Sequence, residues 1–165
     1  MLCGDTTPLT STSAGAVVID ANIAIAICAG ETGRAAKASA ELLRYSTAGY
    51  DFYAPGAIVA ETLYILCGKL QQGLLTVPGH AQATADFQAL MSKILPPPSG
   101  EAAIVLRAEA IRSGYGCSRS ADGIYIALAE ELALSMPSII LTFDQSMSNQ
   151  ASRHAPTVTV VELIP

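Results

Sequence analysis

Short apolar runs alternate along the chain with longer stretches in which apolar residues recur at helical spacing. Four of the short runs predict strands, at residues 16–19, 51–54, 138–143 and 157–161. The runs at 16–19 and 138–143 are almost wholly apolar and rich in β-branched residues. Strands of this kind are typical of parallel sheets that are covered on both faces.

The stretches between these strands predict helices. They cover residues 22–28, 34–48, 56–70, 78–95, 101–113 and 121–134, and a further helix begins at Gln145. Strands separated by helices indicate an α/β fold with a mainly parallel central sheet. We expect one domain over residues 16–165, preceded by a loose, Ser/Thr-rich N-terminal tail over residues 1–15.

Composition narrows the class of protein. Hydrophobic residues make up 51% of the 165 residues and charged residues 14%, which excludes disorder for most of the chain. This apolar excess indicates strands buried on both faces, or an apolar surface covered by a partner. The most apolar stretch, residues 14–29, contains Asp20 and Asn22, so we expect no membrane span. The N-terminus lacks the basic start of a secretory signal, and we expect a cytoplasmic protein.

Cysteine spacing and net charge bear on ligands and partners. Cys3, Cys28, Cys67 and Cys117 form no C-x-x-C pair and the two histidines are isolated, which favours reduced core thiols over a zinc site or disulfides. The net charge of −5 argues against a general nucleic-acid binder. It is compatible with an enzyme that holds nucleic acid locally through divalent cations.

Two aspartates directly follow the clearest predicted strands. Asp20 ends the sequence Val-Val-Ile-Asp, and Asp144 ends Leu-Thr-Phe-Asp. Because ligands of parallel sheets bind beyond the carboxyl ends of the strands, we expect both carboxylates at that edge. The alternative for each is capping, since Asp20 and Asn22 form a D-x-N sequence typical of turns and Asp144 precedes a helix. Asp20 also has the position of an acceptor aspartate in phosphotransfer domains.

Glu61 and Asp122 lie on predicted helices among apolar neighbours. The residues three and four positions away are Ala57, Ile58, Tyr64 and Ile65 for Glu61, and Tyr125 and Ile126 for Asp122. An unpaired buried carboxylate costs several kcal/mol, so each needs a partner or a metal. The alternatives are a structural ion pair for Glu61 and, for Asp122, the favourable position of an acid in the first helical turn.

The four acids come from well-separated segments, each near a strand end or an inward helix face. An all-oxygen set of ligands without His or Cys suits Mg²⁺ or Mn²⁺. Without a metal ion, crowded carboxylates would raise one another's pKa.

The order of these motifs resembles the PIN-domain family of nucleases. The motifs are a strand followed by Asp20-x-Asn22, Glu61 on an apolar helix, Asp122 before Tyr125 and an Ala/Leu-rich helix, and a strand ending in Asp144. The resemblance covers residues 16–161. It implies a three-layer α/β/α sandwich and Mg²⁺- or Mn²⁺-dependent cleavage of single-stranded RNA. Many small members are toxins of toxin–antitoxin pairs that bind a cognate antitoxin and form homodimers, and we expect both partners here.

The resemblance also assigns roles to residues. Asp20, Glu61, Asp122 and Asp144 would bind one or two divalent ions that activate water for hydrolysis of a phosphodiester. Candidate substrate contacts are Asn22, Arg119 and Thr142, with Lys69, Arg112 and Arg153 as further candidates for phosphate. Capping by Asn22, a solvated loop position for Arg119 and a purely structural Thr142 are the alternatives.

The chain departs from the family pattern in its basic residues. Gln145 follows the last aspartate where many members have a basic residue, and the chain has only nine Lys and Arg. This departure favours a second hypothesis, a PIN-like module that binds RNA or protein without cutting. A phosphotransfer domain with Asp20 as acceptor is the third.

Overall fold

A parallel sheet forms the centre of the computed structural model, which describes residues 13–117 and 121–164. Within these residues the sheet has four strands: β1 (Gly15–Ile19), β2 (Tyr50–Tyr53), β3 (Ser138–Thr142) and β4 (Thr159–Glu162). Their order is β2-β1-β3-β4, and every neighbouring pair is parallel. All five residues of β1 are buried, as the apolar run predicts for a central strand. The predicted parallel α/β sheet is confirmed.

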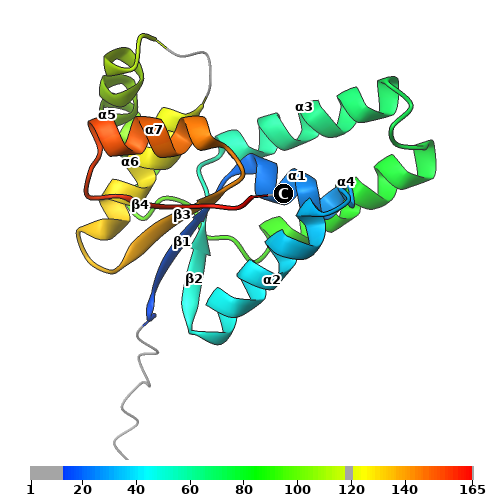
Figure 1. Ribbon diagram of the computed structural model, residues 1–165, viewed down its shortest axis with the longest axis horizontal. Coiled ribbons are helices and arrows are strands. Elements are labelled where there is room, and N and C mark those ends of the chain that lie inside the picture. The colour runs from blue at the N-terminus through cyan, green and yellow to red at the C-terminus, as the bar shows by residue number, and fades with distance from the viewer. Residues whose placement is uncertain (1–12, 118–120, 165) are drawn as a thin grey trace, which may run out of the picture.

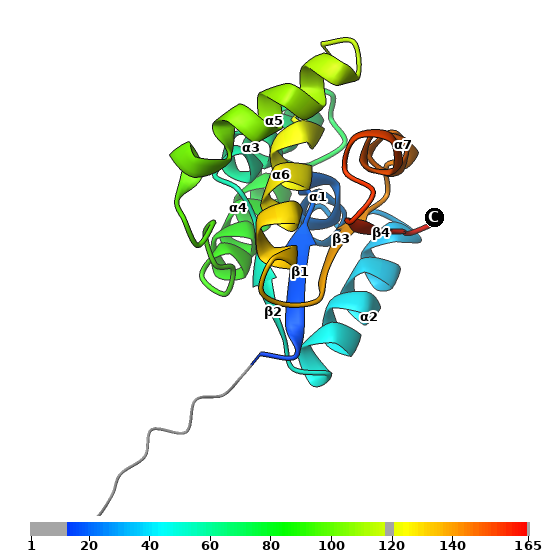
Figure 2. The same ribbon diagram turned by 90° about the vertical axis from the view of Figure 1, so that its left-hand side faces the viewer.

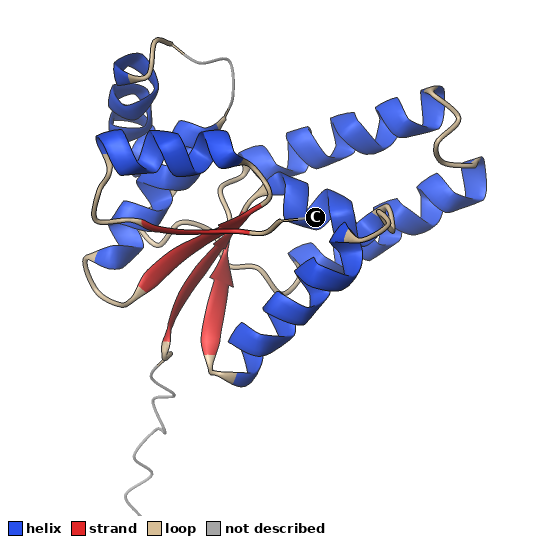
Figure 3. Ribbon diagram, viewed as in Figure 1, coloured by secondary structure: helices blue, strands red, loops and turns tan. Residues whose placement is uncertain are grey.

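Helices cover both faces of this sheet. They are α1 (Ala21–Cys28), α2 (Arg34–Thr47), α3 (Ala57–Gln71), α4 (Val77–Met91), α5 (Glu101–Gly114), α6 (Asp122–Ala133) and α7 (Gln145–His154). Helices α1 and α2 lie on one face and α6 and α7 on the other, with α5 packed outside α6 (Figures 1 and 2). Figure 3 shows the strands enclosed between these helices, which confirms the three-layer sandwich.

Helices α3 and α4 form a hairpin that extends past α1 (Figure 1). None of the helices in the described ranges is both long enough and apolar enough to cross a membrane.

The predicted elements are all present, and two of their boundaries differ for identifiable reasons. Strand β1 begins at Gly15, inside the predicted tail, where Gly15 pairs with Tyr50 of β2. Helix α4 ends at Met91, four residues before the predicted end. Leu95 instead forms a parallel bridge with Tyr53, and as the residue before a proline it is disfavoured in a helix.

The cysteines are only partly the core thiols that we expected. Cys28 is buried, whereas Cys67 on α3 and Cys117 after α5 are exposed. Cys3 lies outside the described residues. The expectation of core thiols is therefore wrong for Cys67 and Cys117, which lie on the surface of the protein.

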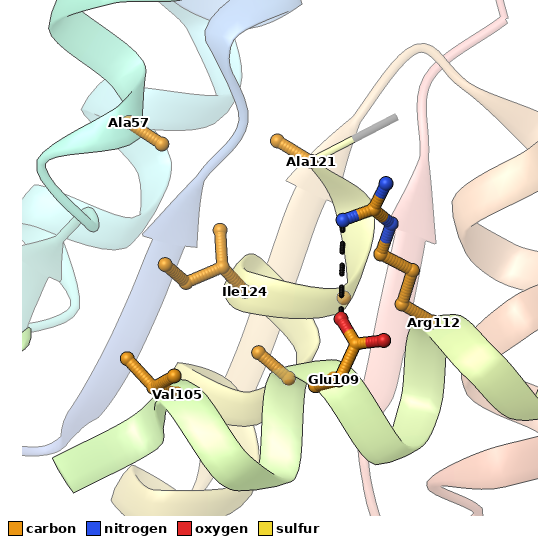
Figure 4. Close-up of a pocket in the computed structure, with 8 residues that line it drawn as sticks. Ala57, Val105, Glu109, Arg112, Ala121 and Ile124 are labelled. Carbon is orange, nitrogen blue, oxygen red and sulfur yellow. Dashed lines mark ion pairs between the residues drawn. The ribbon is translucent and has the colours of Figure 1, made fainter. Parts of the chain in front are cut away.

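Helix α6 packs closely on α5, and Gly123 permits this approach. A Cβ atom at Gly123 would lie 2.7 Å from the carbonyl oxygen of Ala108 and 3.5 Å from the Cβ of Arg112. Figure 4 shows the pocket beside this contact, where Arg112 pairs with Glu109 at 3.8 Å. Since Gly123 follows Asp122, the same packing sets the position of the first turn of α6.

We expect the substitution Gly123→Ala to lower the free energy of unfolding by about 1–3 kcal/mol, because the new methyl group meets a backbone carbonyl. Gly68→Ala in α3 is the matched control, since a Cβ there meets nothing within 4 Å. It should stabilise the helix by about 0.5–1 kcal/mol. Urea unfolding followed by circular dichroism measures both, and a shift of the same sign in the two variants would contradict this account.

Candidate active site

One cleft at the carboxyl edge of the sheet contains all four predicted acids. Strands β1 and β3 end there at Asp20 and Asp144, helix α6 begins there at Asp122, and α3 contributes Glu61. Helix α6 starts at this edge because it leads into β3, whose first residue lies at the opposite edge. The structure thus brings together acids that are far apart in the sequence, since Asp20 and Asp144 are separated by 124 positions.

The carboxylate of Asp20 points across the sheet edge toward β3. Asp20 is 7% exposed, and its Oδ2 accepts hydrogen bonds from the hydroxyl of Thr142 at 2.6 Å and from Nδ2 of Asn22 at 2.5 Å. Asp20 occupies the N-cap position of α1, but its side chain makes no capping hydrogen bond. The capping interpretation therefore does not describe Asp20.

Thr142 and Asn22 connect the ends of β1 and β3 around this carboxylate. The fully buried hydroxyl of Thr142 accepts hydrogen bonds from Nδ2 of Asn22 at 3.0 Å and from the backbone N–H of Asp144 at 2.9 Å. Oδ1 of Asn22 accepts from the backbone N–H of Phe143 at 3.0 Å. Asn22 does not cap α1, and it also lines the cleft. Thr142 is buried behind Asp20, so its hydroxyl orients that carboxylate.

Burial and like charge both act on the carboxylates of the cleft. Burial raises the pKa of Asp20 from 3.8 to about 7, and the negative charges of Asp122 and Glu61 contribute, while the Thr142 hydrogen bond opposes the rise. Burial also raises the pKa of Glu61, with a further contribution from Asp122. A cation bound in the cleft would lower both pKa values, because it favours the ionised forms.

Glu61 lies at the boundary between the buried and exposed faces of α3. Its neighbour Ile58 is buried, but Tyr64 is 78% exposed, so the expected inward apolar face is only partly right. Oε2 of Glu61 accepts a hydrogen bond at 2.6 Å from the hydroxyl of Tyr125, which is buried in α6. Burial, and then this hydrogen bond, raise the pKa of Tyr125, so the hydroxyl keeps its proton and remains a donor.

Asp122 and Asp144 are positioned by α6 and α7. Asp122 is buried in the first turn of α6, and its Oδ2 accepts a hydrogen bond from Nε2 of Gln150, a buried residue of α7. Asp144 is the N-cap of α7, where its Oδ1 accepts from the backbone N–H of Ser146 at 2.7 Å. Capping is therefore confirmed for Asp144, which also lines the cleft.

Three charged residues that we had not assigned to the acidic site also line the cleft. Glu31 and Arg34 come from the turn between α1 and α2 and the start of α2, and Lys69 comes from the last turn of α3. Lys69 was one of the further phosphate candidates. The other two lie elsewhere, Arg112 beside Glu109 and Arg153 over the ring of Tyr115. Arg119 lies outside the described residues, so its contact with substrate stays a prediction.

Sequence reasoning missed the roles of Tyr125, Gln150, Glu31 and Arg34. Tyr125 gave a usable signal, because a residue three positions after Asp122 shares its helix face. Gln150 and Glu31 gave none, since nothing in their neighbouring sequence indicates their partners.

The cleft suits a divalent cation in its chemistry but is not a preassembled metal site. No three His, Cys, Asp or Glu side chains among residues 13–117 and 121–164 are grouped so that they could hold a metal ion. The ligand set is nevertheless all oxygen, as Mg²⁺ and Mn²⁺ prefer, and Asp20 is a buried carboxylate with two acidic neighbours. These residues therefore fit a hard divalent ion.

Comparison with known proteins agrees with this fold. The family model of the PIN domain matches residues 17–152. Three crystal structures share the fold. VapBC2 from Rickettsia felis, bound to a DNA fragment from its promoter, has a TM-score of 0.60 and 11% identity over 89% of this chain and 98% of that one. VapBC-5 from Mycobacterium tuberculosis has a TM-score of 0.51 and 18% identity over 90% and 99%. FitAcB from Neisseria gonorrhoeae has a TM-score of 0.51 and 21% identity over 88% and 96%.

At these identities the three structures show a common fold and no more. None of the curated proteins matches the sequence. The matched residues 17–152, however, make up most of the chain and include Asp20, Glu61, Asp122 and Asp144. The chain belongs to the PIN domain family.

Proposed function

We propose that this protein is a metal-dependent endoribonuclease that hydrolyses phosphodiester bonds of single-stranded RNA in the cytoplasm, as the toxin of a toxin–antitoxin pair. The observation that carries the proposal is the convergence of four acids from separate elements on one cleft. Burial and the charges of Asp122 and Glu61 raise the pKa of Asp20 to about 7, which makes the cleft receptive to a cation. Membership of the PIN domain family supports the same activity.

Some residues of the cleft would bind the metal ion, and others orient the carboxylates that bind it. Asp20, Glu61, Asp122 and Asp144 would hold Mg²⁺ or Mn²⁺. Such an ion lowers the pKa of water and stabilises negative charge on a phosphate. The hydroxyl of Thr142 orients Asp20, that of Tyr125 orients Glu61, and the amide of Gln150 orients Asp122. Partners of this kind restrict a ligating carboxylate to one direction and strengthen metal binding.

An antitoxin and a second copy of the chain are the protein partners that we propose. One of the structural neighbours is a member of the VapBC family of toxin–antitoxin systems. The α3–α4 hairpin exposes apolar side chains that a partner would cover: Val59, Leu63, Tyr64, Ile65, Leu74 and Val77. Exposed apolar side chains gathered on one hairpin favour an interaction site there.

The second candidate function is a PIN domain that binds RNA or protein without cutting it. The observation in its favour is the low positive charge of the cleft, where the basic residues among the described lining are Arg34 and Lys69. Stabilisation by Mn²⁺ without cleavage of any RNA would support this candidate.

We expect Asp20→Asn to abolish Mn²⁺-dependent cleavage of a mixed-sequence single-stranded RNA, because the neutral amide is a poor ligand for a hard cation. Gel electrophoresis of labelled RNA in Mn²⁺, Mg²⁺ or EDTA measures the effect. Asp51→Asn, at an exposed position of β2, removes the same charge and should leave cleavage unchanged. Equal cleavage by native protein and a folded Asp20→Asn variant would rule out the role of Asp20.

We expect Tyr125→Phe to reduce either the rate of cleavage or the affinity for Mn²⁺ by about 10- to 100-fold, because Glu61 loses the donor that orients it. The measurement is cleavage rate against Mn²⁺ concentration. Tyr64→Phe, at a position that is 78% exposed, is the control with the same chemical change. An unchanged Mn²⁺ dependence in Tyr125→Phe would show that Glu61 needs no such partner.

We also expect Asp20→Asn to stabilise the metal-free protein at high pH. The pKa of Asp20 is about 7 in the folded state against an ordinary 3.8, so the folded state favours the protonated carboxyl. The stability that depends on this proton is complete below about pH 4 and is lost as the pH rises through 7. In EDTA at pH 8 the variant should gain on the order of 4 kcal/mol in the free energy of unfolding, because each pH unit between the two pKa values contributes about 1.4 kcal/mol. The gain should shrink as the pH falls toward 4, and a gain independent of pH in urea unfolding would contradict the assignment.

A further inference from the structure

Positive charge is scarce in the cleft, although its proposed substrate is a polyanion. Carboxylates from five residues line it together with the cations of Arg34 and Lys69. The net charge of the whole chain is −5, so the surface as a whole does not attract nucleic acid. Any basic residue inside the cleft is therefore well placed to decide where an RNA backbone lies.

Glu31 pairs with both of these cations. Its Oε1 lies 2.8 Å from Nζ of Lys69, and its Oε2 lies 3.6 Å from Nη1 of Arg34. The side chain of Glu31 is 21% exposed and that of Lys69 is 22% exposed, so this pair is largely screened from solvent. Glu31 lies in the turn between α1 and α2 and Lys69 lies on α3, so their contact connects this turn to α3.

The position of Arg34 is not explained by the stability of its own helix. Arg34 is the first residue of α2, where the helix dipole disfavours a cation. Its guanidinium lies over the ring of Phe143, 5.0 Å from the ring centre, and Phe143 directly precedes Asp144. The contact with Phe143 therefore holds a planar, bidentate donor group in the cleft that Asp144 also lines.

Lys69 has a comparable relation to Glu61. The residues Glu61, Ile65 and Lys69 follow one another at intervals of four on α3, and all three line the cleft. A separation of eight residues corresponds to about 12 Å along the helix axis. Lys69 is thus displaced along α3 from Glu61, as a contact to a phosphate next to the cleaved one requires.

We propose that Arg34 and Lys69 bind the phosphates of single-stranded RNA beside the cleaved bond, and that Glu31 is the counter-ion which they exchange for phosphate. This inference rests on the proposed function. A phosphodiester can replace the carboxylate of Glu31, because its acceptor oxygens suit the planar fork of arginine and its negative charge suits lysine. Without RNA, both cations are paired with Glu31.

The test is the salt dependence of RNA binding. The affinity for a labelled, mixed-sequence single-stranded RNA is measured by fluorescence anisotropy in Mg²⁺ between 50 and 200 mM salt, with the Asp20→Asn protein as background so that the RNA stays intact. Arg34→Gln and Lys69→Gln should each weaken binding and reduce the slope of log affinity against log salt by about 0.7. Glu31→Gln should tighten binding, because both cations lose their competing carboxylate.

Matched controls separate this role from general charge and from folding. Arg44→Gln and Lys93→Gln remove the same charges at exposed positions outside the cleft lining and should leave the slope unchanged. Thermal unfolding of every variant identifies losses of fold. If Glu31 and Lys69 form only a structural ion pair, their variants will lower the melting temperature and leave the slope at the control value, which overturns the proposal.

The outcomes also separate this proposal from the proposed nuclease. Cleavage by the native chain with unchanged slopes in Arg34→Gln and Lys69→Gln would support the nuclease and overturn the phosphate contacts. Reduced slopes without cleavage by the native chain would support the contacts and favour a binding domain. No detectable binding of RNA at 50 mM salt would overturn the contacts, whatever the result of the cleavage assay.

Discussion

The burial of a carboxylate at the end of the central strand is the constraint on which the functional edge depends. Asp20 follows a strand that is buried along its whole length, and its own side chain is 7% exposed. A carboxylate in such a position is costly unless polar partners surround it. Thr142 and Asn22 supply hydrogen bonds, and the same two residues connect the ends of β1 and β3. The hydrogen bonds that offset the cost of burying Asp20 therefore also fix the relative positions of the ends of β1 and β3.

Each of the other three acids also lines the cleft and accepts a hydrogen bond from another part of the protein. Glu61 accepts from Tyr125, Asp122 accepts from Gln150, and Asp144 accepts from the backbone at the start of α7. These donors come from α6 and α7, which cover the opposite face of the sheet from α1 (Figure 1). The close packing of α5 against Gly123 of α6 extends this support beyond the cleft. Stability and the proposed activity place opposite demands on Asp20. Its raised pKa shows that burial favours the protonated carboxyl, whereas metal binding needs the ionised form.

The charged residues of the cleft form two sets with different chemistry. Burial and the like charges of Asp122 and Glu61 raise the pKa of Asp20, which favours a divalent cation. Glu31 pairs with Arg34 and Lys69, which line the same cleft. Under the proposed function, a substrate with a negatively charged backbone would meet a metal ion at the first set and basic side chains at the second. A chain with few basic residues can bind nucleic acid in this way without becoming a general polyanion binder.

The sequence by itself determined the elements of the fold, their mainly parallel arrangement, and the placement of Asp20 and Asp144 at one edge. Apolar periodicity is local, and a residue that ends a buried parallel strand must lie at the carboxyl edge. Only the tertiary structure decided what each acid contacts: Thr142 is 122 positions from Asp20, and Tyr125 is 64 positions from Glu61. Asp144 caps its helix whereas Asp20, before a similar helix, does not. Local sequence encodes which residues are buried, but the partner of a polar side chain depends on distances that exist only after the layers pack together.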